Sequence, residues 1–294
     1  IKDGKLPMHP LPENAGAASL AVDGKPDTAW SADLHGDTDP QLTLDLGRLR
    51  EFGGLVLDWK PGQHASDYLV QLSDDGLRWR DVRTVVGGNG GRDYLALPES
   101  EARYIRLTVG DGPGASFALA GLEVKPLSFA AHPNDLIKAM AADPPKGWFP
   151  RGFSGEQPYW TIVGLDGGRE QGLIGEEGAI EIAKGGVSVE PFVQVDGRWV
   201  GWADVVSTQS LQDGYLPIPT VAWTHPQFSL ATTAFAAGTP GDSRVVARHR
   251  LTNTGTASRE YALALAVQPW QVNPPSQFLN TTGGFSPINA IALS

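Results

Sequence analysis

The chain alternates apolar and polar residues over many short stretches. In the segment 41–46, for example, Leu42, Leu44 and Leu46 occupy every second position. Successive side chains of a β-strand point to opposite faces, so this pattern predicts strands with one buried face. Between turns rich in Gly, Asp and Asn, the same pattern marks residues 68–72, 104–109 and 122–124.

The second half of the chain repeats this pattern. Asp196-Gly197 separates the stretches 187–195 and 198–203, and this dipeptide between two strand-like runs predicts a tight hairpin. Further strands are predicted at 228–235, 244–253 and 261–267. The last of them places four apolar side chains on one face, which are Tyr261, Leu263, Leu265 and Val267.

One short helix is predicted between these two regions. Asn134 is a suitable N-cap for a helix through Met140, and Pro144-Pro145 prevents its continuation. We therefore expect an all-β protein of two sandwiches joined by a short helical linker. The expected parts are a first domain at 1–127, a linker at 128–147 and a larger sandwich at 148–294.

Composition narrows the possible partners. Hydrophobic residues make up 41% of the chain, which is enough apolar material for folded cores, and charged residues make up 19%. The formal net charge of −10 would be repelled by a phosphate backbone or an anionic lipid surface. We therefore expect no nucleic-acid or membrane partner. The chain has no cysteine, which excludes disulfides and thiolate metal sites.

Four motifs follow one another in the first part of the chain, and together they span roughly residues 14–127. They are Ala18–Trp30, Asp67–Trp79, Ala102–Leu107 and Leu119–Val124. In type and order they resemble the discoidin, or coagulation-factor type C, domain family. The resemblance implies a jelly-roll β-sandwich. Many bacterial members of the family are carbohydrate-binding modules, so it also implies a glycan partner and a secreted or periplasmic protein.

The same resemblance implies a structural Ca²⁺ ion. Asp23, Thr28 and Glu123 occupy the matching side-chain positions, and Lys25 occupies a carbonyl position. Calcium takes six to eight oxygen ligands, several of which a tight loop can supply. The alternative is that Asp23 and Thr28 only form a local turn. That alternative does not explain why an otherwise apolar final strand carries Glu123.

A sugar site is expected in loops at one end of the sandwich. Aromatic rings stack on the C–H faces of sugars, and polar side chains pair with the hydroxyls. By their position in the resemblance, the candidate contacts are His35, Trp59, His64, Arg83, Asn89 and Phe117.

The second half is unusually rich in aromatic and amide residues. The segments that show this are Gly147–Trp160, Arg250–Gly255 and Gln268–Asn280. They resemble the β-supersandwich that precedes an (α/α)6 barrel in some glycosidases. The resemblance implies a catalytic domain C-terminal to this region in the same polypeptide, and a non-catalytic role for these 294 residues. The final residues, Ile288–Ser294, resemble the opening of a further strand.

Two other functions stay open at this point. The chain could act alone as an adhesin for glycan, protein or lipid head groups through its first domain. It could also be a hydrolase with a site near Glu156, Trp160 and Asp204. Three further acids in the second half fit solvated turn and strand positions better than a catalytic pair, and they are Glu176, Glu177 and Glu181.

Overall fold

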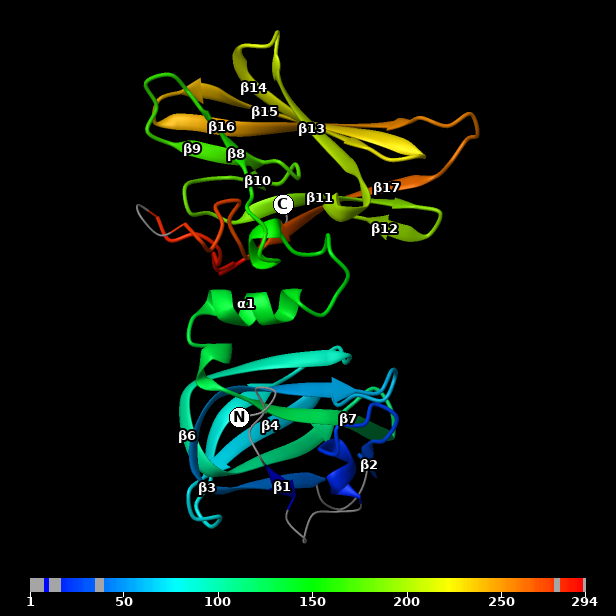
Figure 1. Cartoon of the computed structure of the whole chain (residues 1–294), viewed down its shortest axis with the longest axis vertical. Helices are drawn as coiled ribbons and strands as arrows, with labels where there is room; N and C mark the ends of the chain where they lie inside the picture. The colour runs from blue at the N-terminus through cyan, green and yellow to red at the C-terminus, as the bar shows by residue number, and fades with distance from the viewer. Residues whose placement is uncertain (1–7, 11–16, 35–39, 278–280, 293–294) are drawn as a thin grey trace. The chain divides into compact units, whose positions relative to one another are not determined.

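The computed structural model describes residues 8–10, 17–34, 40–277 and 281–292 (Figure 1). The chain divides into two compact units, Ile1–Leu136 and Ile137–Ser294. Both are built from antiparallel β-strands, which confirms the expected all-β class. None of the helices within the described ranges has the length and apolar character that a bilayer crossing requires.

Unit 1 contains a seven-stranded sheet in the order β2-β7-β3-β6-β4-β5, with β1 beside β3. The strands are β1 His9–Pro10, β2 Trp30–Asp33, β3 Gln41–Trp59, β4 Asp67–Ser73, β5 Arg80–Val85, β6 Arg92–Asp111 and β7 Ser116–Lys125. Two 3-10 helices accompany them, η2 Ala18–Ala21 and η3 Leu127–Phe129.

Two long strands, β3 and β6, hold the layers of unit 1 together. The start of β3 pairs with the end of β6, as Gln41 opposite Thr108, and the end of β3 pairs with the start of β6, as Asp58 opposite Arg92. Breaks in the pairing register divide each strand into two halves. Both strands therefore run through two layers of the jelly-roll sandwich that the sequence predicted.

Gly54 lies where β3 resumes its pairing after such a break. A Cβ atom at this position would lie 2.3 Å from the carbonyl oxygen of Leu95 and 2.6 Å from the ring of Phe129. Only glycine allows such a close approach of backbone to backbone.

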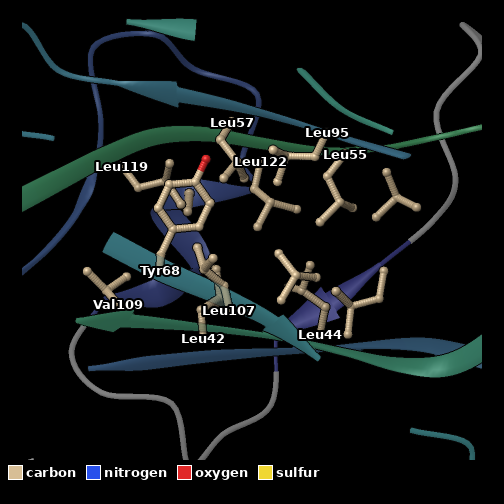
Figure 2. Packing of buried hydrophobic residues seen from close by; sticks show 14 of the residues in the cluster. Leu42, Leu44, Leu55, Leu57, Tyr68, Leu95, Leu107, Val109, Leu119 and Leu122 are labelled. Atoms are coloured by element: carbon tan, nitrogen blue, oxygen red, sulfur yellow. The ribbon is translucent and has the colours of Figure 1, made fainter. Parts of the chain in front are cut away.

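The core of unit 1 is formed by leucines and aromatic residues from both layers. The residues labelled in Figure 2 are Leu42, Leu44, Leu55, Leu57, Tyr68, Leu95, Leu107, Val109, Leu119 and Leu122. The alternating leucines of segment 41–46 are all buried, as the sequence pattern predicted. Their burial fixes the register of β3, because a slip by one residue would expose the whole set.

The polar residues of two sequence motifs stabilise the turn end of unit 1. Ser73 Oγ accepts a hydrogen bond from the amide of Gly76, and the Asp75 carboxylate accepts bonds from two further amides of the β4–β5 turn. Arg103 forms a two-pronged ion pair with Asp45, with both distances at 2.9 Å. These motif residues therefore have structural roles.

Unit 2 contains a six-stranded sheet and a four-stranded sheet. The first has the order β12-β11-β10-β9-β8, with β17 on the other side of β11, and the second has the order β13-β14-β15-β16. The strands are β8 Trp160–Gly164, β9 Gln171–Gly175, β10 Ile180–Glu181, β11 Ser188–Val195, β12 Arg198–Val200, β13 Val206–Gln212, β14 Leu216–Thr224, β15 Phe228–Thr239, β16 Asp242–Asn253 and β17 Tyr261–Gln268. Short 3-10 helices are η4 Arg151–Phe153 and η5 Trp202–Asp204.

The two sheets of unit 2 share one apolar core. Ile174 and Val193 of the first sheet pack in it with Trp223 and Leu230 of the second. The hairpin predicted at Asp196-Gly197 is confirmed between β11 and β12, and both residues have positive φ, at 50° and 77°. These values are typical of the tight turn that this dipeptide favours.

The apolar face of β17 is not buried as its alternation suggested. Leu263, Leu265 and Val267 are 37, 46 and 45% exposed. Among the described strands, β17 pairs with β11 alone, so its outer edge is open. The periodicity correctly predicted a strand, but it does not reveal whether another layer covers that strand.

The predicted helix begins one residue before its expected cap. Helix α1 spans Pro133–Ala141, so Asn134 lies in its first turn and is not the N-cap. Capping falls to His132, whose ring nitrogen Nδ1 accepts a hydrogen bond from the Asn134 amide. Asp135 Oδ2 in turn accepts a bond from the His132 amide. Proline is favoured at the first helical position because its fixed φ suits the helix.

Candidate functional site

Three connections meet at one end of the unit 1 sandwich, which we call the loop end. They are residues 60–66 after β3, 86–91 after β5 and 112–115 after β6. Backbone hydrogen bonds join them, from Trp59 N to Gly91 O, from Gly88 N to Ser66 O and from Ala118 N to Gln63 O, all 2.8 or 2.9 Å long. The loop end is therefore a fixed surface.

Two of the predicted sugar contacts meet at the loop end. His64 is half-buried and packs directly on the 86–91 connection: a Cβ atom at Gly90 would lie 2.6 Å from its ring. Asn89 is the residue before Gly90 and is exposed. The imidazole of His64 thus contacts the residue that follows Asn89, and both side chains offer hydrogen-bond donors and acceptors.

The structure corrects the two predicted aromatic contacts. Phe117 is fully buried, with its ring edge-on to Trp30 at 4.9 Å between centroids. It was expected before the last strand, but β7 begins at Ser116 and so points Phe117 into the core. Trp59 is 4% exposed and packs on Tyr68. Neither ring has a free face for a sugar, so neither is a stacking contact.

Asp93 satisfies the indole N–H of buried Trp59, and no sequence pattern predicted this role. Its Oδ2 accepts hydrogen bonds from Trp59 Nε1 at 2.8 Å and from the Tyr68 hydroxyl at 2.7 Å. Burial, and then the neighbouring carboxylate of Asp93, raise the pKa of Tyr68. One carboxylate therefore satisfies two polar groups at the rim of the core.

The remaining two candidates are Arg83 and His35. Arg83 lies on the edge strand β5 and is exposed, and its charge acts on the pKa of Tyr68 in the opposite direction to Asp93. His35 lies outside the described residues.

The loop before β2 gathers several oxygen atoms, as the calcium prediction requires. Thr28 Oγ1 lies 2.9 Å from both carboxylate oxygens of Asp23 and 3.0 Å from the carbonyl oxygen of Lys25. A hydroxyl has one hydrogen and can serve only one of these acceptors at a time. Four oxygen atoms therefore lie close together with a single hydroxyl hydrogen to share. Such a group of oxygen ligands suits a hard cation. The Lys25 amide also donates to Asp23, as in a simple turn.

Glu123 lines the same pocket as Asp23 and Lys25, although it comes from β7, the last strand of unit 1. Its Oε2 accepts a 2.5 Å hydrogen bond from Lys125 Nζ, so a cation would have to share this carboxylate with that lysine. Within the described ranges no three His, Asp, Glu or Cys residues gather at one point. The predicted set has only two carboxylates and takes its other oxygens from a hydroxyl and a carbonyl.

Comparison with known families assigns this first part of the chain. The family model described as the F5/8 type C domain matches residues 11–121.

Unit 1 carries an F5/8 type C domain.

Solved structures similar to the chain include several carbohydrate-binding modules. Chitosan-binding module 1 of a Paenibacillus sp. IK-5 chitosanase/glucanase is 27% identical, with a TM-score of 0.36, over 41% of this chain and 94% of the module. A Clostridium perfringens CBM32 module solved with GalNAc-β-1,3-galactose is 23% identical, with a TM-score of 0.36, over 41% of this chain and 99% of the module. The family 32 module of C. perfringens NanJ, solved with galactose, is 19% identical, with a TM-score of 0.36, over 41% and 97%. No curated protein matches the chain significantly.

Outside the F5/8 type C domain, the residues of the hydrolase alternative have separate contacts. Glu156 pairs with Lys146 at 2.6 Å and with Arg151 at 2.9 Å, and the hydrogen bond from Lys146 lowers its pKa. Asp204 accepts a bond from the Gly201 amide at the start of η5. In the described part of unit 2, no hydrogen bond joins these acids to Trp160.

Two of the three acids expected at solvated positions are buried, and Glu176 is half-buried. Glu177 and Glu181 are 8% and 1% exposed, and Glu190, which the sequence reading passed over, is 5% exposed. Glu181 accepts bonds from the amides of Gly185 and Asn273, and Glu190 accepts one from Trp270 Nε1. These acids anchor the segment after β17. An acid within an apolar strand was the available signal for Glu190, as it was for Glu123.

Proposed function

We propose that the F5/8 type C domain binds glycan at its loop end, through His64 and Asn89. The observation that carries this proposal is the contact of the His64 ring with the Gly90 backbone, beside exposed Asn89. Paired donors and acceptors on a fixed surface suit the adjacent hydroxyl groups of a sugar. Val86, which is 77% exposed in the same connection, offers an apolar contact that Trp59 and Phe117 do not.

A glycan array probed with the whole chain tests this function. We expect binding to at least one glycan, with affinity reduced about tenfold or more in His64→Ala and Asn89→Ala, since each loses a paired hydrogen bond. Asp74→Ala is the matched control, because Asp74 is exposed on the opposite turn of unit 1. Glycan binding unchanged in both loop-end variants would contradict the site. Binding to liposomes and to no glycan would favour the lipid head-group alternative.

We also propose that the Asp23–Thr28 loop and Glu123 hold a structural Ca²⁺ ion. The convergence of oxygens around Thr28 Oγ1 supports this proposal, and so does the shared pocket that brings Glu123 to the loop. Bound Ca²⁺ would add a positive charge between the carboxylate of Asp23 and that of Glu123, which it would share with Lys125. The chain's own residues would fix the loop against β7 and leave the loop end free for ligand.

Calorimetric titration with CaCl₂ after chelation tests the cation site. We expect one Ca²⁺ per chain and a higher melting temperature when it binds, because a ligand of the folded state stabilises that state. Asp23→Ala should abolish both effects. Asp27→Ala, an exposed acid in the same loop, should keep them. Equal calcium binding by wild type and Asp23→Ala would contradict the assignment.

In the whole polypeptide, we propose that unit 1 tethers a catalytic domain to its glycan substrate. Tethering raises the effective concentration of substrate even when each contact is weak. The open β17 face of unit 2 supports a further neighbouring domain. The complete reading frame tests this role. It should encode an export signal and a helical-repeat catalytic domain, and a frame with neither would favour a stand-alone adhesin.

A further inference from the structure

A hollow lies on the outer face of the larger sheet of unit 2. Its floor is apolar and is formed by Trp160, Ile162 and Leu173. The hollow has a volume of about 310 Å³. This size is within the range of pockets that hold small ligands.

Strand alternation explains why these side chains face outward. Ile162 pairs with Leu173 across β8 and β9, so both project to one face. Their neighbours Val163 and Ile174 project to the other face and are buried in the core. The apolar floor is therefore the second face of a sheet whose first face is already packed.

The walls of the hollow are held in place by buried Glu181. Its two carboxylate oxygens accept hydrogen bonds from the Gly185 amide at 2.9 Å and the Asn273 amide at 3.0 Å. Gly283 lies so close to the facing backbone that a Cβ atom there would fall 2.0 Å from Pro274 O. Both walls are thus fixed before any ligand arrives, which reduces the entropy lost on binding.

Four polar side chains around the floor have no partner among the described residues. The indole N–H of Trp160, the side-chain carboxamides of Gln171 and Gln277 and the ammonium of Lys184 make no hydrogen bond or ion pair with any described residue. Gln277 belongs to the amide-rich segment that stood out in the sequence. Donors and acceptors without internal partners therefore surround an aromatic and aliphatic floor.

We propose that this hollow is a second saccharide site, for one or two units of a neutral oligosaccharide. The indole of Trp160 and the side chain of Ile162 would contact C–H faces, and the amides would pair with hydroxyls. A cationic ligand fits less well, because the carboxylate of Glu181 is already engaged by backbone amides. An acidic sugar fits less well, because the carboxylate of Glu181 in the same lining opposes a second negative charge and Lys184 is the only cation among the described lining residues. This site does not depend on the function proposed for unit 1.

The indole N–H resonances of the nine tryptophans test the proposal by NMR on the whole chain. Trp160→Phe assigns the Trp160 signal. Neutral cello-, xylo-, galacto- and chito-oligosaccharides of two to four units are the probes, with a uronate series beside them. We expect at least one neutral series to shift the Trp160 signal saturably. The double variant Lys184→Ala/Gln277→Ala, which alters two exposed side chains, should weaken that binding at least fivefold.

The control is Arg198→Ala/Gln212→Ala, which alters two exposed residues outside the hollow and should bind as wild type does. The proposal is overturned if no neutral series shifts the Trp160 signal. It is also overturned if uronates shift the signal more strongly than neutral sugars do, or if glycerol shifts it equally well. Unchanged binding in Lys184→Ala/Gln277→Ala overturns it as well. Signals of Trp30, Trp59 and Trp79 report on unit 1 separately. Absence of glycan binding by unit 1 is therefore distinguishable from absence of binding at this hollow.

Discussion

At the scale of single residues, burial controls the charge of Glu190. Removal from water raises its pKa to about 7, and the nearby charge of Glu177 adds to this effect. Trp270 Nε1 donates a hydrogen bond to the same carboxyl group at 2.5 Å. Between about pH 4.5 and 7 the folded chain therefore binds more protons at this residue than the unfolded chain, and stability falls as the pH rises through that window.

We therefore expect Glu190→Gln to stabilise the protein at pH 8 and to have little effect at pH 4.5. The amide keeps an acceptor for Trp270 and removes the buried charge. A shift from 4.5 to about 7 corresponds to roughly 3 kcal/mol, or a melting temperature higher by about 5 °C or more at pH 8. Melting curves at both pH values measure this. An equal shift at both would mean that the charge of Glu190 is not the cause.

At this scale, the sequence indicated which residues are polar loop candidates better than it indicated what surrounds each side chain in the fold. It placed polar His64 and Asn89 at a loop surface, and the structure brings them together. It failed for Phe117, because one residue of error in the start of β7 turns a surface ring into a core ring. It could not find Asp93, since the partners of this acid come from two other strands.

At the scale of elements, β3 depends on a position without a side chain. We expect Gly54→Ala to destabilise unit 1 by about 3 kcal/mol or more, because its Cβ would overlap the Leu95 carbonyl and the Phe129 ring. Gly114→Ala is the matched control, since its Cβ would lie 3.8 Å from the nearest atom. Urea unfolding of both variants measures the difference. Equal stability would show that β3 can move away from β6 at this point.

Two strands that were not predicted from the sequence lack the usual strand pattern, and each has a physical reason. Strand β13 is exposed along nearly its whole length, so it carries no apolar alternation. Strand β14 contains Pro217 and Pro219, and proline usually argues against a strand interior. Pro219 nevertheless pairs with Leu211 in the sheet. The strands that were predicted, such as β4 and β11, each have a buried face that repeats every second residue.

At the scale of the whole molecule, each unit has its own apolar core. We therefore expect two separable transitions in calorimetry. Calcium should raise the transition of unit 1, and a change from pH 5 to pH 8 should lower that of unit 2, which Glu190→Gln identifies. A single transition that responds to both treatments would show that the two cores unfold as one cooperative unit.

The open edge of β17 has a consequence for handling the protein. A strand with unpaired backbone groups and exposed Leu263, Leu265 and Val267 is a template for edge-to-edge association between molecules. No lysine, arginine or proline interrupts β17 to act as a gatekeeper. Concentrated solutions of these 294 residues should therefore form oligomers through this strand, and the charge of −10 would slow that assembly at low salt more than at high salt.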